Sequence, residues 1–165
     1  MVRRALLFAA ITGLLLAGAG CSEDEGPEAE TFSAALSGAN ERPNPVNTAA
    51  SGTATFTVNG QTIDFAINVS NIVGTRLAHI HGPAAADGSN TASVVVTLLT
   101  PIAAPGTNIA AGVLSSGTFP SATYALSANI VMDSVLAWMR TGRAYVNVHT
   151  VANGGGEIRG TVVRQ

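Results

Sequence analysis

The chain has 165 residues, a formal net charge of −2 and a mean hydropathy of +0.34, with one cysteine and no lysine. Its few arginines form no basic stripe, so we expect no nucleic-acid partner. The length is sufficient for one domain that buries a hydrophobic core without disulfides or structural metals.

The N-terminal 20 residues have the pattern of an export signal. Two arginines precede an apolar run, Ala5–Ala19, which is too short to span a bilayer comfortably. Small residues then lead into Cys21, in an arrangement that resembles a bacterial lipobox, although Gly18 stands where an apolar residue is usual. The resemblance implies that residues 1–20 are a signal peptide and that Cys21 is lipidated. The alternative is an ordinary secretory signal followed by an incidental cysteine.

Residues 21–31 are predicted to form a flexible acidic tether behind the lipidated cysteine. Five of the nine residues of Ser22–Glu30 are acidic, and none can anchor a core. Ser22 does not match the aspartate that commonly retains bacterial lipoproteins in the inner membrane. We therefore expect a lipid-anchored protein of the bacterial cell envelope, at the outer membrane, facing the periplasm or the cell surface.

Residues 32–165 are predicted to form an all-β domain. Short alternating segments rich in Thr, Val, Ser and Ala are broken by Gly, Pro and Asn, which is typical of an antiparallel β-sandwich or barrel. We expect about 7–9 strands in an immunoglobulin-like or superoxide-dismutase-like Greek key. The dipeptide Asn59-Gly60 predicts a two-residue type I′ hairpin turn that pairs Phe56 with Ile63. In that hairpin Phe56, Ile63, Phe65 and Ile67 share one face.

The remaining elements follow from the same patterns. One short amphipathic helix is expected over Asp133–Arg140, with Asp133 capping its start and Gly142 at its end. The other expected strands are Phe32–Leu36, Arg76–His81, Ser93–Leu98, Val113–Phe119, Arg143–Thr150 and Glu157–Val163.

All three histidines of the chain lie in two of the predicted strands. His79 and His81 are two residues apart, so both imidazoles point to one face of their strand. His149 shares a face with Tyr145 and Asn147 on the other strand. In the last strand Glu157 and Arg159 are expected to face outward. These side chains gather on one surface only if the strands are neighbours.

Two interpretations of this cluster remain open. His79, His81 and His149 match the three-ligand pattern of exposed copper or zinc centres, in which one position stays open. Glu157 is then a fourth ligand or a residue that orients a histidine, and Tyr145, Asn147 and Arg159 are candidates for contacts behind the ligands because of their places on the strands. In the alternative, the histidines bond the backbone of loops and Glu157 pairs with an arginine. No cofactor is certain.

Four segments in this order resemble the CHRD domain, first described in the developmental regulator chordin. The resemblance covers about residues 32–163 and departs from the family at Arg42 and Gly155. It implies an all-β exported domain with no established catalytic activity. The segments that carry it are Leu36–Pro43, Ala78–Ala84, Tyr145–Thr150 and Gly156–Gly160.

Three functions follow as hypotheses. The first is a non-enzymatic binding or structural module, anchored in the cell envelope by its lipid and contacting an envelope protein. The second is a copper- or zinc-binding protein that uses His79, His81 and His149. The third is an enzyme resembling copper-zinc superoxide dismutase, against which the histidine supply argues, since the two-metal site of that enzyme needs more histidines than the three present here.

Overall fold

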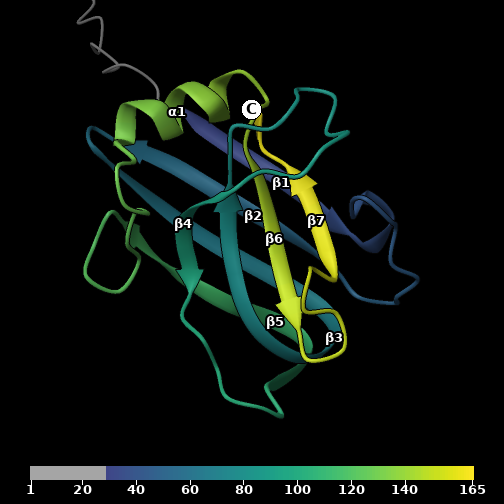
Figure 1. The fold of residues 1–165 in the computed structure, drawn as a ribbon. Coiled ribbons are helices and arrows are strands. Elements are labelled where there is room, and N and C mark those ends of the chain that lie inside the picture. The colour runs from purple at the N-terminus through teal and green to yellow at the C-terminus, as the bar shows by residue number, and fades with distance from the viewer. Residues whose placement is uncertain (1–28) are drawn as a thin grey trace, which may run out of the picture.

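The computed structural model describes residues 29–165, which form an antiparallel β domain with one α-helix (Figure 1). The predicted signal peptide, the lipidation site at Cys21 and most of the acidic segment lie outside the described residues. The elements are β1 (Thr31–Ser37), the 3-10 turn η1 (Gly38–Asn40), β2 (Ser51–Asn59), β3 (Thr62–His81), β4 (Val94–Leu99), β5 (Thr107–Phe119), α1 (Met132–Arg140), β6 (Tyr145–Thr150), β7 (Ile158–Thr161) and β8 (Val163–Arg164).

The strands form one strongly curved sheet that returns on itself. The order of hydrogen-bonded strands is β2-β1-β7-β6-β3-β4. β2, at one end of this order, also pairs with β3, so the sheet closes on itself. Two further strands lie off this path: β5 pairs with β3, and β8 pairs with β1. Every strand pairing is antiparallel. The prediction of an antiparallel all-β domain with one short helix is confirmed, and its eight strands fall within the expected number.

β3 departs from the sequence prediction because it is one strand of 20 residues rather than two separate strands. Its first half pairs with β2 and its second half with β6 and β4. Between the halves Asn71 and Gly74 have φ angles of 55° and 68°, and the register with β5 shifts between Ile72 and Thr75. These left-handed residues bend the strand without ending it, because the hydrogen bonds resume on either side. Because of this bend, the part of β3 that contains His79 lies beside β6.

The hairpin between β2 and β3 forms with a different register from the predicted one. Asn59 pairs with Thr62 and Phe56 with Phe65, so Gly60 and Gln61 occupy the turn. Gly60 has a φ of 63° and Gln61 is not among the residues with positive φ, which fits a type II′ turn with glycine in its first central position. The predicted pairing of Phe56 with Ile63 was therefore wrong. The observed register differs from the predicted one by two residues, and because side chains alternate with period 2, each side chain keeps its predicted face.

The core fills the space inside the curved sheet. Phe56 and Phe119 meet edge to face with ring centroids 6.4 Å apart, and Phe65 lies 6.0 Å from Phe119. Ile63 and Ile67 are fully buried beside them. Side chains of β2, β3 and β5 thus converge on one apolar cluster, and burial of this area is the main favourable term in folding.

The helix lies across one end of the strands, near the C-terminus (Figure 1). It buries Val135, Leu136 and Met139, and Gly142 follows its last turn with a φ of 66°. Asp133 lies in the first turn, but the N-cap position is Val131, so the predicted cap at Asp133 was wrong. Within residues 29–165 no helix has both the length and the apolar character needed to cross a membrane.

The N-terminal end of the described chain is bonded to the same end of the domain. Glu30, which the sequence assigned to the tether, lies 2.6 Å from the Arg140 guanidinium and 3.5 Å from that of Arg164. β1 begins at the next residue, Thr31. The chain therefore enters the domain between α1 and β8.

Candidate metal centre

The second half of β3 lies between β6 and β4, so the two strands that carry the histidines are neighbours. In the register of β3 with β6, His79 is opposite Asn147, His81 opposite Tyr145, and Leu77 opposite His149. Residues opposite one another in a sheet share a face. The sequence predicted this shared face but not the pairing of the strands, which the structure supplies.

The shared face is buried, contrary to the expectation that Glu157 and Arg159 point outward. Arg159 on β7 is 2% exposed, and Asn147 and Glu157 are also buried. Residues 38–50 and 82–93 fold over this face: Thr48 bonds Glu157, and the carbonyl groups of Gly88 and Asn90 accept hydrogen bonds from Arg159. The strand pattern set the face correctly, but a pattern cannot show that loops will cover it.

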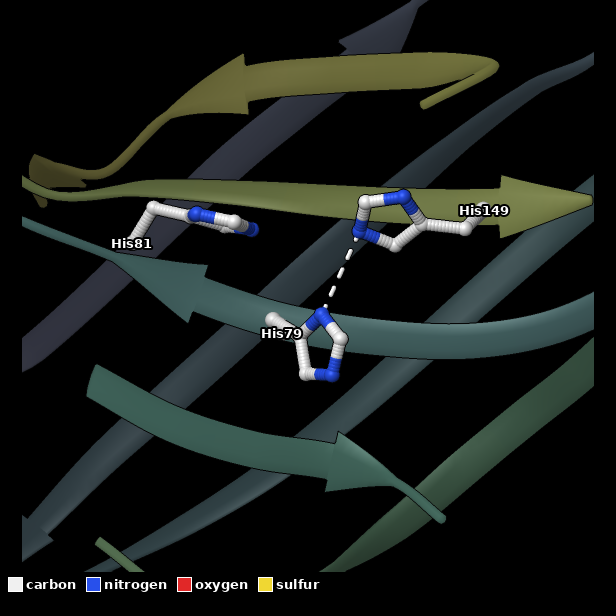
Figure 2. Close-up of side chains that lie close together, drawn as sticks. All are labelled: His79, His81 and His149. Atoms are coloured by element: carbon white, nitrogen blue, oxygen red, sulfur yellow. Dashed lines mark hydrogen bonds between the residues drawn. The ribbon is translucent and has the colours of Figure 1, made fainter. Parts of the chain in front are cut away.

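The three histidines converge on one point (Figure 2). One ring nitrogen from each lies within 4.8 Å of the others. Nδ1 of His79 is 3.2 Å from Nε2 of His149, the contact that Figure 2 marks with a dashed line. Metal–imidazole bonds are about 2.0–2.1 Å long, so two nitrogens that share a tetrahedral ion lie about 3.4 Å apart, and the outermost pair here would have to approach by up to about 1.5 Å.

Backbone carbonyl groups fix two of the rings. Nδ1 of His81 donates to the carbonyl oxygen of Ala92 at 2.9 Å, and Nδ1 of His149 donates to that of Gly154 at 3.1 Å. A neutral imidazole that donates through Nδ1 keeps its lone pair on Nε2. Both Nε2 atoms therefore present acceptor lone pairs to the cluster. Metal-binding histidines have this arrangement, with the second nitrogen bonded to a carbonyl or carboxylate.

Nε2 of His81 has no hydrogen-bond partner among the described residues, although it is buried. A buried polar atom without a partner costs about 1–3 kcal/mol. The atom points toward the other two rings in Figure 2. This is the one feature of the cluster that hydrogen bonds to loops do not explain.

All three histidines are neutral at pH 7. Burial lowers the pKa of His79 to about 4, with smaller contributions from His149 and His81. Burial also lowers the pKa of His81 to about 4, against the effect of its bond to Ala92, and it lowers the pKa of His149. Neutral imidazole is the form that binds metal ions. His81 and His149 already present the lone pair of Nε2, whereas Nδ1 of His79 donates to Nε2 of His149 and would have to lose that proton to bind an ion.

Tyr145 and Arg159 form a stack under His81. The Tyr145 ring is parallel to the His81 ring within 3°, with centroids 4.8 Å apart, and the Arg159 guanidinium carbon lies 3.5 Å from the Tyr145 centroid. The hydroxyl oxygen of Tyr145 accepts a bond from the Ala92 amide at 3.1 Å. Tyr145 therefore supports His81 twice, through its ring and through the residue that bonds His81.

Glu157 does not belong to the three-histidine group. Its carboxylate accepts hydrogen bonds from Thr48 at 2.7 Å, Thr150 at 2.6 Å and Asn153 at 3.1 Å. Burial alone would raise the pKa of Glu157, but these three bonds together lower it. Since Thr150 follows His149 and Asn153 precedes Gly154, the carboxylate fixes the loop whose carbonyl group holds His149.

Glu41 is a buried residue of this layer that the sequence did not single out. Its carboxyl accepts a bond from the Asn147 amide at 3.3 Å, while Oε1 of Glu41 and Oδ1 of Asn147 have no partner among the described residues. Burial raises the pKa of Glu41 to about 7, and bonding to Asn147 and the charge of Arg159 limit the increase. The only available signal was its position in the segment Leu36–Pro43.

The fold and this cluster define an antiparallel β domain with a covered, histidine-containing polar face. The family model described as the CHRD domain matches residues 32–162. The chain therefore belongs to the CHRD domain family, as the sequence resemblance indicated. Neither the curated proteins nor the solved structures compared with the chain gave a significant match.

Replacing Glu41 by glutamine is expected to stabilise the protein at pH 8. A folded-state pKa near 7, against an ordinary 4.5, means that the folded protein binds more protons than the unfolded chain between these values, so stability falls as the pH rises through them. Glu41→Gln removes that loss. We expect a gain of about 1–3 kcal/mol at pH 8, vanishing below pH 4.5, in urea denaturation curves.

Glu157→Gln is the matched control with the opposite sign. The lowered pKa of Glu157 means that its carboxylate stabilises the fold above pH 4.5 and loses this effect as the pH falls through its folded value. The variant should be about 1–3 kcal/mol less stable than the parent at pH 8. Destabilisation by both substitutions at pH 8 would contradict the assignment for Glu41.

Proposed function

We propose that this CHRD domain is a non-enzymatic binding module of the cell envelope whose ligand is a copper or zinc ion. The observation that carries the proposal is the convergence of three ring nitrogens within 4.8 Å, one of them the buried and unpartnered Nε2 of His81. An ion bound there would supply the missing partner. It would be held by Nδ1 of His79 and Nε2 of His81 and His149.

The hydrogen bonds around the cluster support this proposal. His81 and His149 are oriented by backbone carbonyl groups, and Tyr145 and Glu157 hold the two loops that provide them. Fixed ligands bind more tightly because little conformational freedom is lost on binding. His79 is the more adaptable ligand, since it is only partly buried and no backbone carbonyl group fixes its ring among the described residues; its ring bonds Nε2 of His149.

The competing interpretation is that the histidines are purely structural. It accounts for the two bonds to backbone carbonyl groups and for the contact of His79 with His149. It leaves the buried Nε2 of His81 unexplained. Metal binding separates the two interpretations.

Calorimetric titration of the full chain in detergent with copper(II) and zinc(II) tests the site. We expect one ion per chain with micromolar or tighter affinity. The double variant His79→Ala/His81→Ala and the single variant His149→Ala should lose the binding, because three donors are needed to replace the hydration shell of the ion. Asp64→Asn, which removes an exposed carboxylate on β3, controls for surface binding and should behave as the parent.

An absence of binding in the parent would establish the histidines as structural. Equal binding by the parent and the histidine variants would place the ion elsewhere.

The anchoring part of the proposal rests on the sequence. Cys21 follows a signal-like segment and would carry the lipid, and residues 22–30 would separate the domain from the membrane. Metabolic labelling with radioactive palmitate in a bacterial host should mark the parent chain and not Cys21→Ser. After membrane fractionation the variant should be found in the aqueous fraction. Retention of the unlabelled variant in the membrane fraction would contradict a lipid anchor. An envelope protein that binds the module is a further part of this proposal.

We also propose that the bound ion does not support superoxide dismutation. The cluster offers three histidines and, among the described residues, no carboxylate, so it lacks the donors of a second metal. The copper-loaded chain should accelerate the decay of superoxide no more than the His149→Ala variant in the same copper buffer. A rate that depends on His149 would identify an enzyme instead.

A further inference from the structure

The donors of the three-histidine site carry no charge. Each of the three residues offers one imidazole nitrogen, and the group contains no carboxylate or thiolate among residues 29–165. A divalent ion bound there would keep its whole charge. His81 and His149 are each 8% exposed and His79 is partly buried, so water would offset only part of this charge.

The contacts behind the ligands add no negative charge either. His81 and His149 donate to the carbonyl oxygens of Ala92 and Gly154 rather than to carboxylates. Many zinc sites instead have a carboxylate in this position, which makes the imidazole a stronger donor. Glu157, the carboxylate of the adjoining loop, is engaged by three donors, and Glu41 bonds Asn147.

A permanent positive charge lies close to the site. Tyr145 on β6 stands between β7, which carries Arg159, and β3, which carries His81. The guanidinium carbon is 3.5 Å from the tyrosine centroid, and the histidine ring is stacked on that tyrosine at 4.8 Å. Arg159 is 2% exposed, and its hydrogen bonds go to neutral carbonyl groups of Gly88 and Asn90. Within the described residues the ion pairs are those of Glu30 with Arg140 and Arg164, so no carboxylate forms a direct ion pair with this guanidinium, although the carboxyl of Glu41 is close enough to attract it.

We propose that the three-histidine site selects a monovalent ion, copper(I), over copper(II) and zinc(II), because its ligands are neutral and Arg159 is held beside them. This inference rests on the proposed function and names its ligand. Repulsion by Arg159 and the cost of burying charge both increase with the charge of the ion. Copper is the metal in question because imidazole binds it well and alkali cations prefer oxygen donors.

The size of the effect follows from Coulomb's law. The stacked rings place the guanidinium roughly 10 Å from the ion, and at an effective dielectric constant of about 20 one additional unit of charge on the ion then weakens its binding by about tenfold. Removal of Arg159 should therefore lower the preference of the site for copper(I) over the divalent ions by about tenfold.

The experiment compares the affinities of the full chain in detergent for three ions. Copper(I) is titrated anaerobically against bicinchoninate under excess ascorbate, and copper(II) and zinc(II) against chelators of known affinity. In the parent, the dissociation constant for copper(I) should be at least tenfold below those for both divalent ions. In Arg159→Met the ratio of the copper(II) dissociation constant to the copper(I) dissociation constant should fall by about tenfold. This change corresponds to a decrease of about 60 mV in the midpoint potential of bound copper.

Two control variants separate charge from packing. Arg159→Lys keeps the positive charge and should keep most of the preference. Arg164→Met removes an exposed charge on β8 and should leave the ratio unchanged. If Arg159→Met fails to fold, the ratio in the parent decides alone.

Equal or tighter binding of copper(II) or zinc(II) by the parent would overturn the inference while leaving the metal site intact. An unchanged ratio in folded Arg159→Met would overturn the role of Arg159. Binding of none of the three ions would contradict the metal site itself, and the inference would fall with it.

Discussion

The burial of a polar sheet face is the constraint on which the rest of this structure depends. Residues 38–50 and 82–93 cover the face of β3, β6 and β7, so its polar groups need partners inside the protein. The covering loops provide most of them through backbone carbonyl groups and threonine hydroxyls. Such a layer costs more to form than an apolar one of the same size, and it specifies one arrangement of the loops. The covering loops and the polar side chains beneath them therefore depend on each other for their arrangement.

Within this layer some polar groups have several partners and others have none. Glu157 has three donors, and the guanidinium of Arg159 has two carbonyl partners and an aromatic ring. By contrast, Oε1 of Glu41, Oδ1 of Asn147 and Nε2 of His81 have no partner among the described residues, and the His81 nitrogen is the one directed at two other imidazoles. A folded protein seldom leaves such a group unsatisfied without a functional reason. The hydrogen bonds made by the surrounding residues also hold the His81 ring in place. The ring therefore cannot turn to find a partner for its Nε2.

Electrostatics distinguishes this cluster from a site for a strongly charged ion. Its donors are neutral, the atoms behind them are carbonyl oxygens, and the buried guanidinium of Arg159 is close by. The acidic residues that fall in the same layer bond other groups, Glu157 its loop and Glu41 the amide of Asn147. The charge around the site is therefore set by residues outside the two strands that carry the histidines: Glu41, which follows η1, and Glu157 and Arg159, which come shortly after His149.

The sequence by itself determined the all-β class, the helix, the faces of the strands and the family, because strand alternation and turn residues are local properties. It placed His79 and His81 on one side of a strand and His149 beside Tyr145 and Asn147. It could not determine that β3 and β6 pair, that β3 runs unbroken through Asn71 and Gly74, or that loops bury Glu41 and Arg159. These features depend on contacts between segments distant in the chain. Only the tertiary structure therefore decided that the three imidazoles meet and what charge surrounds them.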